Sequence, residues 1–505
     1  MPLCLRLGSV ILGQMRFEGL LDRRTLLASV LTSAATSGCL IDRAPLAFDA
    51  VADAWVDPSV DAFVPGDAGN DADLDARLDP SIDAWSPDAF ASPDAFQPVD
   101  AFTRVDAGCM PRCALDGLTL MPCDGPPRMC EGACGTSVSN PEPHCLVLEP
   151  ANVPAMVDVR GASATITVGA NATWDTGHCD AMGLPGVPMD HIHKIRGTGD
   201  EDLCIVRALA FRLEAGVRLQ AVGRRPLVIV SPTSITIEAG ATLSVASVTP
   251  PDCRVPVAGA GAGAGARTGG TPGGEGMAAT GDTGGGGGGF CGPGGDGGEG
   301  NGGRRGGEGG EAVDFPSMTP LVGGASGGRG SPMASGGVGG PGGGALQLSA
   351  PSLVIYGNVL AHGAGGLGGR YPGSDAGSGG GGGSGGAVLL EAIRLVSTGY
   401  IDVRGGGGGG GACNSGDSPH GACAASSTVP ALMSGGAPGT CSSVGFGGDG
   451  ASGEFLDGSS GQDAFNGGGG GGGAGCVALR VYESGSVWTA PSAPGVLSTG
   501  MPSVR

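Results

Sequence analysis

Apolar and polar residues alternate in two closely similar stretches of the chain. Leu213–Leu219 reads LEAGVRL, and Ile237–Leu243, 24 residues later, reads IEAGATL. Alternation with a period of two is typical of a strand with one buried face, and the central glycine is typical of a tight corner. A short unit of strand, corner and strand cannot bury its apolar face alone, so a repeat at this period predicts stacked units.

The same pattern returns toward the C-terminus in segments rich in Val, Ile and Leu, which favour strands. We therefore predict an all-β fold, a right-handed parallel β-helix or solenoid in which each repeat is one coil. Stacking in register places Leu213 beside Ile237, and Leu219 beside Leu243. The predicted coils are residues 208–247, 345–361, 387–403 and 477–481.

Long glycine-rich tracts separate these coils, at residues 250–344, 362–386 and 404–475. Each tract follows a strand, which ends at Val245, Ala361 or Val403, so we expect all three to leave the stack from one corner and to decorate one face. Ordering glycine costs about 0.5–1 kcal/mol per residue more than ordering alanine. This cost predicts that 258–344 and 404–475 are less ordered than the coils. The alternative is that they pack on one another as extended left-handed polyglycine helices.

The N-terminal residues 1–39 are predicted to be a lipoprotein signal peptide. Two arginines, Arg23 and Arg24, precede an apolar run over 25–35, and small residues then lead to Cys39. The run is shorter than the ~20 apolar residues that a membrane-spanning helix needs. We expect Cys39 to be lipidated and to anchor the chain to a membrane, whereas the alternative is an ordinary secretory signal with an incidental cysteine.

An acidic, proline-containing spacer follows at residues 40–108. It holds 15 Asp, 3 Arg and no Glu or Lys, so its net charge is 3 − 15 = −12. An Asp-Ala-aromatic motif recurs six times in it, as at Trp55 and Phe102. Like charges repel and proline interrupts helices, so we predict a disordered tether rather than a folded domain. A recognition repeat is the alternative reading of the aromatic residues.

Cysteines divide the rest of the chain. Six of them fall within residues 109–145, which predicts a small disulfide-rich module, since an exported chain meets oxidising conditions. Fifteen connectivities are open, and zinc is the alternative, although the C-x3-C spacing differs from the usual C-x2-C. Residues 146–505 form the predicted solenoid with its glycine-rich insertions. The disulfide candidates are Cys109, Cys113, Cys123, Cys130, Cys134, Cys145, Cys179, Cys204, Cys253, Cys291, Cys413, Cys423, Cys441 and Cys476.

The overall composition narrows the function classes. The formal net charge of −21 argues against nucleic acid as a partner, because phosphates need basic patches. Aromatic residues make up only 4% of the chain and glycine supplies 107 of 505 residues, so a large conventional core is not expected over much of it. No glycine tract is followed by the Lys-Ser/Thr of a phosphate loop.

Candidate reactive residues are few. His191 and His193 would share one face of a strand as a metal pair, but the sequence offers no third ligand, and surface polar residues are the favoured reading. Asp296 and Asp449 lie in motifs that only partly match calcium-binding repeats. The acid–base pairs Asp402 and Arg404, and Glu391 and Arg394, read as ordinary exposed strand positions. We therefore predict no catalytic residue, no bound metal and no cofactor.

The layout resembles a broad class of surface lipoproteins predicted in myxobacteria-like bacteria. The shared features are the signal ending at Cys39, the Asp-Ala spacer 40–108, the C-x3-C module, and coils flanked by Gly-Gly-x-Gly tracts. The resemblance implies a surface location, with the outer membrane as the expected site, and it carries no catalytic residues across.

The predicted function is that of a non-catalytic cell-envelope lipoprotein, structural or adhesive. Its expected partners are the membrane, through the lipid anchor, and surface glycans or other envelope proteins. The alternative is a carbohydrate-active β-helix enzyme or a glycan-binding protein. A row of acidic and basic residues in a groove along the stacked coils would favour the enzyme.

Overall fold

The computed structural model describes residues 109–504, with gaps. The predicted signal peptide, Cys39 and the tether lie outside the described residues, as do Cys253, Cys423 and Cys441. The gaps are residues 115–117, 131–132, 138–139, 183, 185–186, 197–201, 251–254, 263–280, 314–316, 333–334, 372–374, 414–443, 453–454, 483–486 and 489–494. All described residues belong to one compact unit, Ala101–Arg505.

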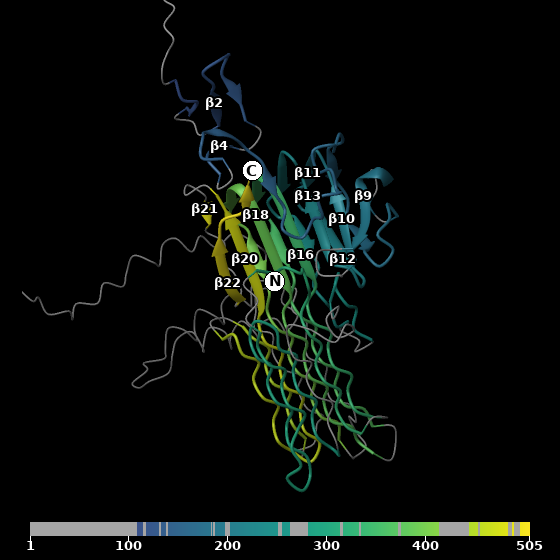
Figure 1. Ribbon diagram of the computed structural model, residues 1–505. Coiled ribbons are helices and arrows are strands. Elements are labelled where there is room, and N and C mark those ends of the chain that lie inside the picture. Colours follow the sequence, from purple (N-terminus) through teal and green to yellow (C-terminus); the bar gives the residue numbers. More distant parts are fainter. Residues whose placement is uncertain are drawn as a thin grey trace, which may run out of the picture. The chain divides into compact units, whose positions relative to one another are not determined.

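The described chain is almost entirely β. Its single helical element is the 3-10 turn η3 (Met189–His191), and no described helix has the length and apolar character needed to cross a bilayer. Eleven strands form the largest sheet, which contains the ordered path β22-β20-β18-β16-β13-β10-β9 (Figure 1). Its strands are β7 (Ile166–Val168), β9 (Ile192–Arg196), β10 (Asp202–Arg207), β11 (Ala210–Leu213), β13 (Leu227–Val230), β14 (Ser234–Ile237), β16 (Ala345–Ile355), β18 (Ala387–Ser397), β20 (Gly475–Val481), β21 (Val487–Trp488) and β22 (Gly495–Gly500).

A second, five-stranded sheet has the order β19-β17-β15-β12-β8. Every pairing in it is parallel, and so is every pairing in the large sheet except β9 with β10. We call one strand segment of the large sheet together with the following strand of this second sheet a rung. The second sheet consists of β8 (Ala172–Asp175), β12 (Arg218–Val222), β15 (Thr242–Ser244), β17 (Asn358–Leu360) and β19 (Tyr400–Asp402).

The predicted register between the two similar stretches is confirmed. Leu213 pairs with Ile237 and Leu219 pairs with Leu243. The corner glycine of the first stretch, Gly216, has φ = 75°, and that of the second, Gly240, has φ = 74°. This left-handed conformation is accessible to glycine without the steric cost that a Cβ brings, which explains why both corners carry it.

The main core lies between the two sheets. In the large sheet the side chains of Phe211, Ile235, Leu353 and Leu395 follow one another across paired strands. A matching ladder in the five-stranded sheet packs in the same buried cluster. That ladder is Leu219, Leu243, Val359 and Ile401. Each rung therefore contributes one apolar layer to a continuous core, as the alternating pattern predicted.

A second apolar layer covers the other face of the large sheet. Val228, Val230 and Leu389 point away from the main core and pack with Val157 and Leu321. Both faces of the central strands are therefore buried. This explains why β13 reads as an unbroken apolar run, LVIV, rather than as an alternation.

Short antiparallel strands make up the segment before the rungs. β1 (Arg112–Cys113), β2 (Thr119–Met121) and β3 (Arg128–Met129) form one sheet, and β4 (Ala133–Gly135) pairs with β5 (His144–Leu146). The C-terminal β23 (Ser503–Val504) pairs with β6 (Leu148–Glu149). This segment contacts the stack, because Ala133 and Leu146 pack against Ile393 of β18.

Disulfides join ten of the described cysteines. Three bridges lie within residues 109–145. A fourth joins the segment before β9 to β10, and a fifth joins the glycine-rich tract at Cys291 to β20. The pairs are Cys109–Cys123, Cys113–Cys134, Cys130–Cys145, Cys179–Cys204 and Cys291–Cys476. Cys413 is also disulfide-bonded. Four of these bridges join cysteines 14 to 25 positions apart, whereas Cys291–Cys476 joins residues 185 positions apart.

Replacing Ile237 with aspartate tests the stacked core. Ile237 has no exposed surface and pairs with Leu213 on one side and Ile355 on the other. We expect Ile237→Asp to lower the free energy of unfolding by at least ~3 kcal/mol, because it buries a charge without a partner. Chemical unfolding with the disulfides intact measures the change. The neighbouring Thr236→Asp faces outward and should cost less than ~1 kcal/mol, and equal losses in the two variants would contradict the stack.

Candidate functional site

The glycine tracts leave the stack at equivalent points, as the sequence predicted. They follow β15, β17 and β19, which are neighbours in the five-stranded sheet and end in register at Ser244, Leu360 and Asp402. The tracts then run side by side beyond the sheets (Figure 1). We call the described glycine-rich segments between residues 281 and 475 the glycine bundle.

Backbone hydrogen bonds join the segments of the glycine bundle at every third residue. Gly285 donates to the carbonyl of Gly379 at 3.0 Å, and Gly288 donates to that of Gly382 at 2.9 Å. The same spacing recurs between other segments, for example Gly379→Gly467, Gly382→Gly470 and Gly385→Gly473. A three-residue repeat in an extended chain is that of a left-handed helix with three residues per turn and a rise of about 3.1 Å per residue.

The expectation that the tracts are less ordered than the coils stays a prediction, which hydrogen exchange tests. The structure has the alternative arrangement, in which extended glycine helices pack on one another. Three consecutive residues of the segment 284–289 bond to different neighbours: Gly284 donates to Gly298, Gly285 donates to Gly379, and Gly286 accepts from Gly328. These backbone hydrogen bonds offset the entropic cost of ordering glycine. The parts of the tracts at 263–280 and 414–443 lie outside the described residues.

Close approach of the helices explains why the interior positions are glycine. A Cβ on Gly284 would overlap the carbonyl oxygen of Gly468, and a Cβ on Gly381 would overlap that of Gly286. Neither residue has a positive φ. Glycine is therefore needed at these positions because a Cβ would keep the neighbouring backbones apart, and not because the backbone conformation is unusual.

Every third side chain of several segments points outward. Residues 292–300 read GPGGDGGEG, in which Asp296 and Glu299 are exposed while the glycines between them are buried. Two exposed positions one turn apart are separated by about 9 Å along the helix. Other exposed third positions are Glu308, Glu311, Arg329, Val338, Phe446 and Asp449.

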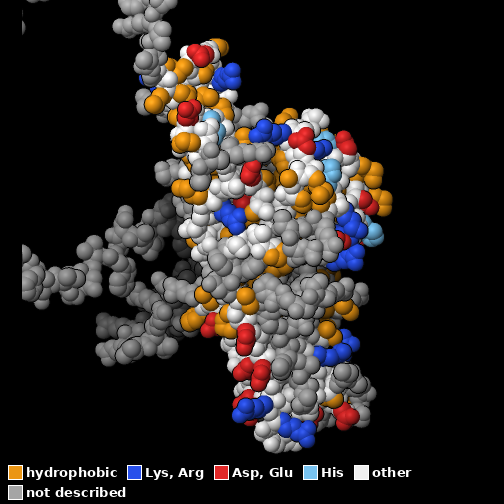
Figure 2. Space-filling view, in the orientation of Figure 1, with side chains coloured by type: hydrophobic (Ala, Val, Ile, Leu, Met, Phe, Trp, Pro, Cys, Tyr) orange, Lys and Arg blue, Asp and Glu red, His pale blue; other side chains and the backbone are white. Residues whose placement is uncertain are grey.

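Several of these exposed side chains are acidic and lie on adjacent segments. Gly297 donates to Gly307, which places Asp296 and Glu299 beside the segment of Glu308 and Glu311. On the other side of this segment, the amide of Gly461 donates to the carbonyl of Asp296, so the segment that contains Asp463 is also adjacent. Figure 2 shows acidic side chains gathered along one flank of the lower part of the molecule. The glycine bundle thus presents a mainly acidic surface, with Arg304 and Arg305 also exposed, on a scaffold whose interior is mostly backbone packed on backbone with a few buried side chains such as Phe290 and Leu367.

Exposed aromatic residues adjoin this surface. The exposed fractions are 53% for Phe446, 77% for Phe455 and 42% for Phe465. Phe446 and Gln462 lie on paired segments, because the backbone of Gln462 donates to the carbonyl of Phe446 at 2.9 Å. Phe446 therefore stands beside polar side chains of the neighbouring segment, and exposed apolar groups rimmed by polar ones are a common mark of an interaction surface.

The interpretation of Glu391 as an exposed strand residue is wrong. Glu391 has no exposed surface, because the segment at Ala151 and the side chain of Arg480 cover it. Its Oε2 accepts from Gln347 Nε2 and Ser349 Oγ, both at 2.8 Å, and from Ala151 N at 3.1 Å. Its Oε1 accepts from Arg480 Nη1 at 3.0 Å. Its predicted partner Arg394, by contrast, is exposed.

This buried network has a structural explanation. Ser349, Glu391 and Arg480 are register partners on β16, β18 and β20, so the charged groups stack across three rungs. Asn152 extends the network, donating to Gln347 Oε1 at 3.0 Å and to the carbonyl of Met318 at 2.9 Å. These hydrogen bonds fasten the covering segments at 151–152 and 318 to the large sheet, although Asn152 Oδ1 is buried without a partner among the described residues.

Asp402 and Arg404 are also buried rather than exposed, with 1% and 3% of their surfaces accessible. Asp402 Oδ2 lies 2.7 Å from Arg404 Nη2, and its Oδ1 accepts from Arg404 Nε at 2.9 Å. Burial lowers the pKa of the neighbouring His362 and so favours its neutral form. Burial, together with the charge of Asp402, raises the pKa of Tyr400 to about 12. Tyr400, Asp402 and Arg404 lie where β19 passes into the glycine bundle, and His362 lies just after β17. The charges of Asp402 and Arg404 neutralise each other there.

The interpretation of the two histidines as surface polar residues is wrong for His191, which is 3% exposed. His191 belongs to η3 rather than to strand β9, and its Nδ1 lies 2.7 Å from the carbonyl oxygen of Arg207, to which it donates. His193 lies on β9, where burial lowers its pKa. Asp296 and Asp449 stand on separate segments, and Asp296 Oδ1 accepts from Gly309 N at 2.7 Å. Within the described ranges no three His, Cys, Asp or Glu residues are grouped as a metal would need.

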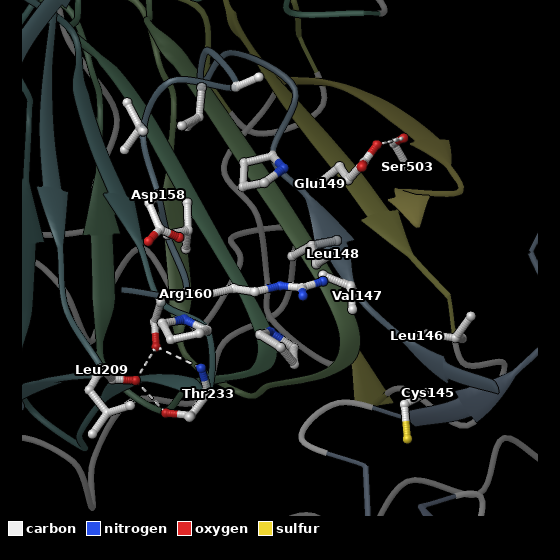
Figure 3. Close-up of a pocket in the computed structure, with 18 of the residues that line it drawn as sticks. Cys145, Leu146, Val147, Leu148, Glu149, Asp158, Arg160, Leu209, Thr233 and Ser503 are labelled. Atoms are coloured by element: carbon white, nitrogen blue, oxygen red, sulfur yellow. Dashed lines mark hydrogen bonds between the residues drawn. The ribbon is translucent and has the colours of Figure 1, made fainter. Parts of the chain in front are cut away.

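A groove of about 1060 Å³ borders the segment 145–160 (Figure 3). Leu148, Leu209 and several prolines line it, and Glu149 and Asp158 supply carboxylates. Arg160 extends its guanidinium across the groove toward Val147 and makes no hydrogen bond or ion pair with the described residues. Glu149 Oε2 accepts from Ser503 Oγ at 3.3 Å. The groove is therefore amphipathic, with charged groups of both signs.

The sequence analysis expected a decorated face on the glycine tracts but did not identify the regular display of side chains on it. Its signal was present, because the residues between glycine pairs recur at intervals of three, as in Asp296 and Glu299 or Glu308 and Glu311. That spacing marks a three-residue helix with one exposed face. The burial of Glu391 and Asp402 had no comparable local signal, since it depends on covering segments distant in sequence.

Replacing Gly381 with alanine tests whether the glycine bundle is packed. The added methyl group would meet the carbonyl of Gly286, so we expect a loss of about 1–3 kcal/mol of stability and faster hydrogen exchange at Gly285 and Gly470. In the wild type those amides should exchange as slowly as that of Val228. Glu308→Ala, at an exposed third position, is the control and should change stability by less than ~0.5 kcal/mol. Fast exchange at these glycines in the wild type would contradict the packed arrangement.

Comparison with known proteins gives no relative from which to transfer a function. No protein-family model, no curated protein and no solved structure matches the chain.

Proposed function

We propose that this chain is a non-catalytic cell-envelope lipoprotein, structural or adhesive, whose glycine bundle makes the contact with its partner. The observation that carries the proposal is that backbone atoms form most of the interior of the bundle while its side chains stand at the surface. Its interior is backbone packed on backbone, and side chains such as Glu299, Glu308 and Phe446 project at exposed positions. A rigid scaffold with displayed side chains lowers the entropic cost of binding.

The proposed partners are surface glycans or other envelope proteins. Exposed phenylalanines offer apolar faces to a sugar ring or to a protein side chain. The adjacent carboxylates and the amide of Gln462 offer hydrogen-bonding groups to the same partner. Phe446 and Gln462 already stand on paired segments, so one partner would reach both.

We also propose that the rungs close into a right-handed parallel β-helix. Support comes from the repeated order of strands, in which β11 and β14 precede β12 and β15 and each pairs with its counterpart. Crossovers between parallel strands of one sheet are almost always right-handed. A crystal structure with left-handed crossovers, or with the two sheets opening apart, would refute this architecture.

A carbohydrate-active enzyme remains the alternative function. Acidic and basic residues do align along the rungs, as in Glu391 and Arg480, but these side chains are buried or largely covered instead of lining a groove. The groove that contains Glu149, Asp158 and Arg160 is the feature that favours the alternative. Release of sugars from bacterial polysaccharides by the purified chain would support an enzyme.

Neutralising part of the acidic surface tests the adhesive function. We expect the double variant Glu308→Ser and Glu311→Ser to reduce binding of the purified chain to bacterial surfaces or to a glycan array by about thirtyfold, since each of two lost charged hydrogen bonds contributes about 1 kcal/mol or more. The matched control is Asp124→Ser with Glu142→Ser, two exposed acidic residues outside the bundle. Undiminished binding by the bundle variant, or equal losses in both, would refute the proposed contact surface.

Replacing Cys39 with alanine tests the proposed anchor. Acyl chains contribute about 0.8 kcal/mol per buried CH₂, and stable anchoring needs more than one chain. We expect the wild-type chain to sediment with membranes, in the outer-membrane fraction, and the Cys39→Ala chain to remain in the soluble exported fraction. Immunoblots of fractionated cells measure this distribution. Equal membrane association of the two chains would show that Cys39 is not the anchor.

A further inference from the structure

The strand β22 forms an unpaired edge of the large sheet. β22 (Gly495–Gly500) pairs in parallel with β20 through six register positions, and no other strand of the described chain pairs with its far side. The far side therefore presents backbone donors and acceptors that can extend the sheet. Leu497 on this strand is 46% exposed.

The sequence of β22 lacks the charged residues that commonly discourage further pairing at an edge. The strand reads GVLSTG and carries no charge, and Pro494 and Pro502 lie outside it. The opposite edge of the same sheet differs in this respect. β9 reads IHKIR, so a histidine, Lys194 and Arg196 fall on that edge. Charged residues on an edge strand are a common device against unwanted pairing, and only one of the two edges has it.

The β22 edge is also held in place. Directly after it, β23 pairs with β6, and Val504 of β23 packs against the cluster of Ala133, Leu146 and Ile393. A strand fixed on one side by β20 and at its end by β23 is a preorganised template. A partner that pairs with it avoids much of the cost of ordering the edge.

We propose that β22 pairs with β22 of a second copy of this chain, antiparallel, to form a symmetric dimer. A two-fold axis brings two identical edges together in opposite directions, and antiparallel strands exchange their N–H and C=O groups directly. Since the strand is uncharged, no like charges oppose each other across the axis. Pairing with the β9 edge of another copy, a heterologous contact that builds rings or filaments, is disfavoured because β9 carries Lys194 and Arg196.

The oligomeric state of the full chain carrying Cys39→Ala, which keeps the chain water-soluble, tests this inference. We expect a dimer by sedimentation equilibrium. Leu497→Lys should raise the dimer dissociation constant by about tenfold or more, since two like charges would face each other at the axis. Leu209→Lys is the matched control, since Leu209 is 36% exposed and lies at a corner far from β22 in the strand order, and it should leave the dimer intact.

Hydrogen exchange at two protein concentrations locates the contact without relying on a variant. The amides of 495–500 should exchange more slowly at the higher concentration, while those of β13 stay unchanged. A monomer at all concentrations would overturn the inference. The inference would also be overturned if Leu497→Lys left the dimer unaffected, or if Leu497→Lys and Leu209→Lys weakened it equally. Filaments in which the amides of β9 exchange more slowly would overturn it as well. If Leu497→Lys fails to fold, the concentration dependence at 495–500 decides.

Discussion

Backbone hydrogen bonding between neighbouring segments is the interaction on which the whole described structure depends. In the rungs it joins strands such as β16 and β18, and in the glycine bundle it joins segments such as 284–289 and 379–385. The two regions differ in what surrounds the hydrogen bonds. The strands bury them between apolar layers, whereas the bundle buries them by bringing backbones so close that no Cβ fits.

The two regions are continuous, because several segments of the bundle lead directly into β16, β18 and β20. At the junction, the amide of Gly475 donates to the carbonyl of Val403, and the amide of Gly386 donates to that of Ala361. Segments that are neighbours in the sheets therefore stay hydrogen-bonded neighbours in the glycine bundle. The disulfide Cys291–Cys476 adds a covalent link from the bundle to the first residues of β20. Buried charges mark the same junction, where Asp402 and Arg404 pair at the end of β19.

The order of apolar and polar residues along the sequence predicted those parts of the fold that depend on residues close together in the chain. The alternation around Leu213 and Ile237 set their register, and corner glycines such as Gly216 marked the turns. The packing of the glycine tracts on one another was only the alternative expectation, because the entropic cost of glycine is a property of one residue, whereas the compensating hydrogen bonds come from several distant segments. The burial of Glu391 was missed for the same reason, since the segment at Ala151 that covers it lies 240 residues earlier.

The three-residue periodicity of the bundle governs how its sequence can change over evolution. An exposed residue such as Glu299 or Val338 can be exchanged for nearly any other side chain, since it has no role in the interior. Deleting one residue, however, rotates the rest of a segment by about a third of a turn, which drives its outward side chains into spaces that only glycine fits. The surface is thus open to rapid diversification by substitution, whereas segment length changes only in whole triplets, and such a protein would vary in what it displays while keeping its dimensions.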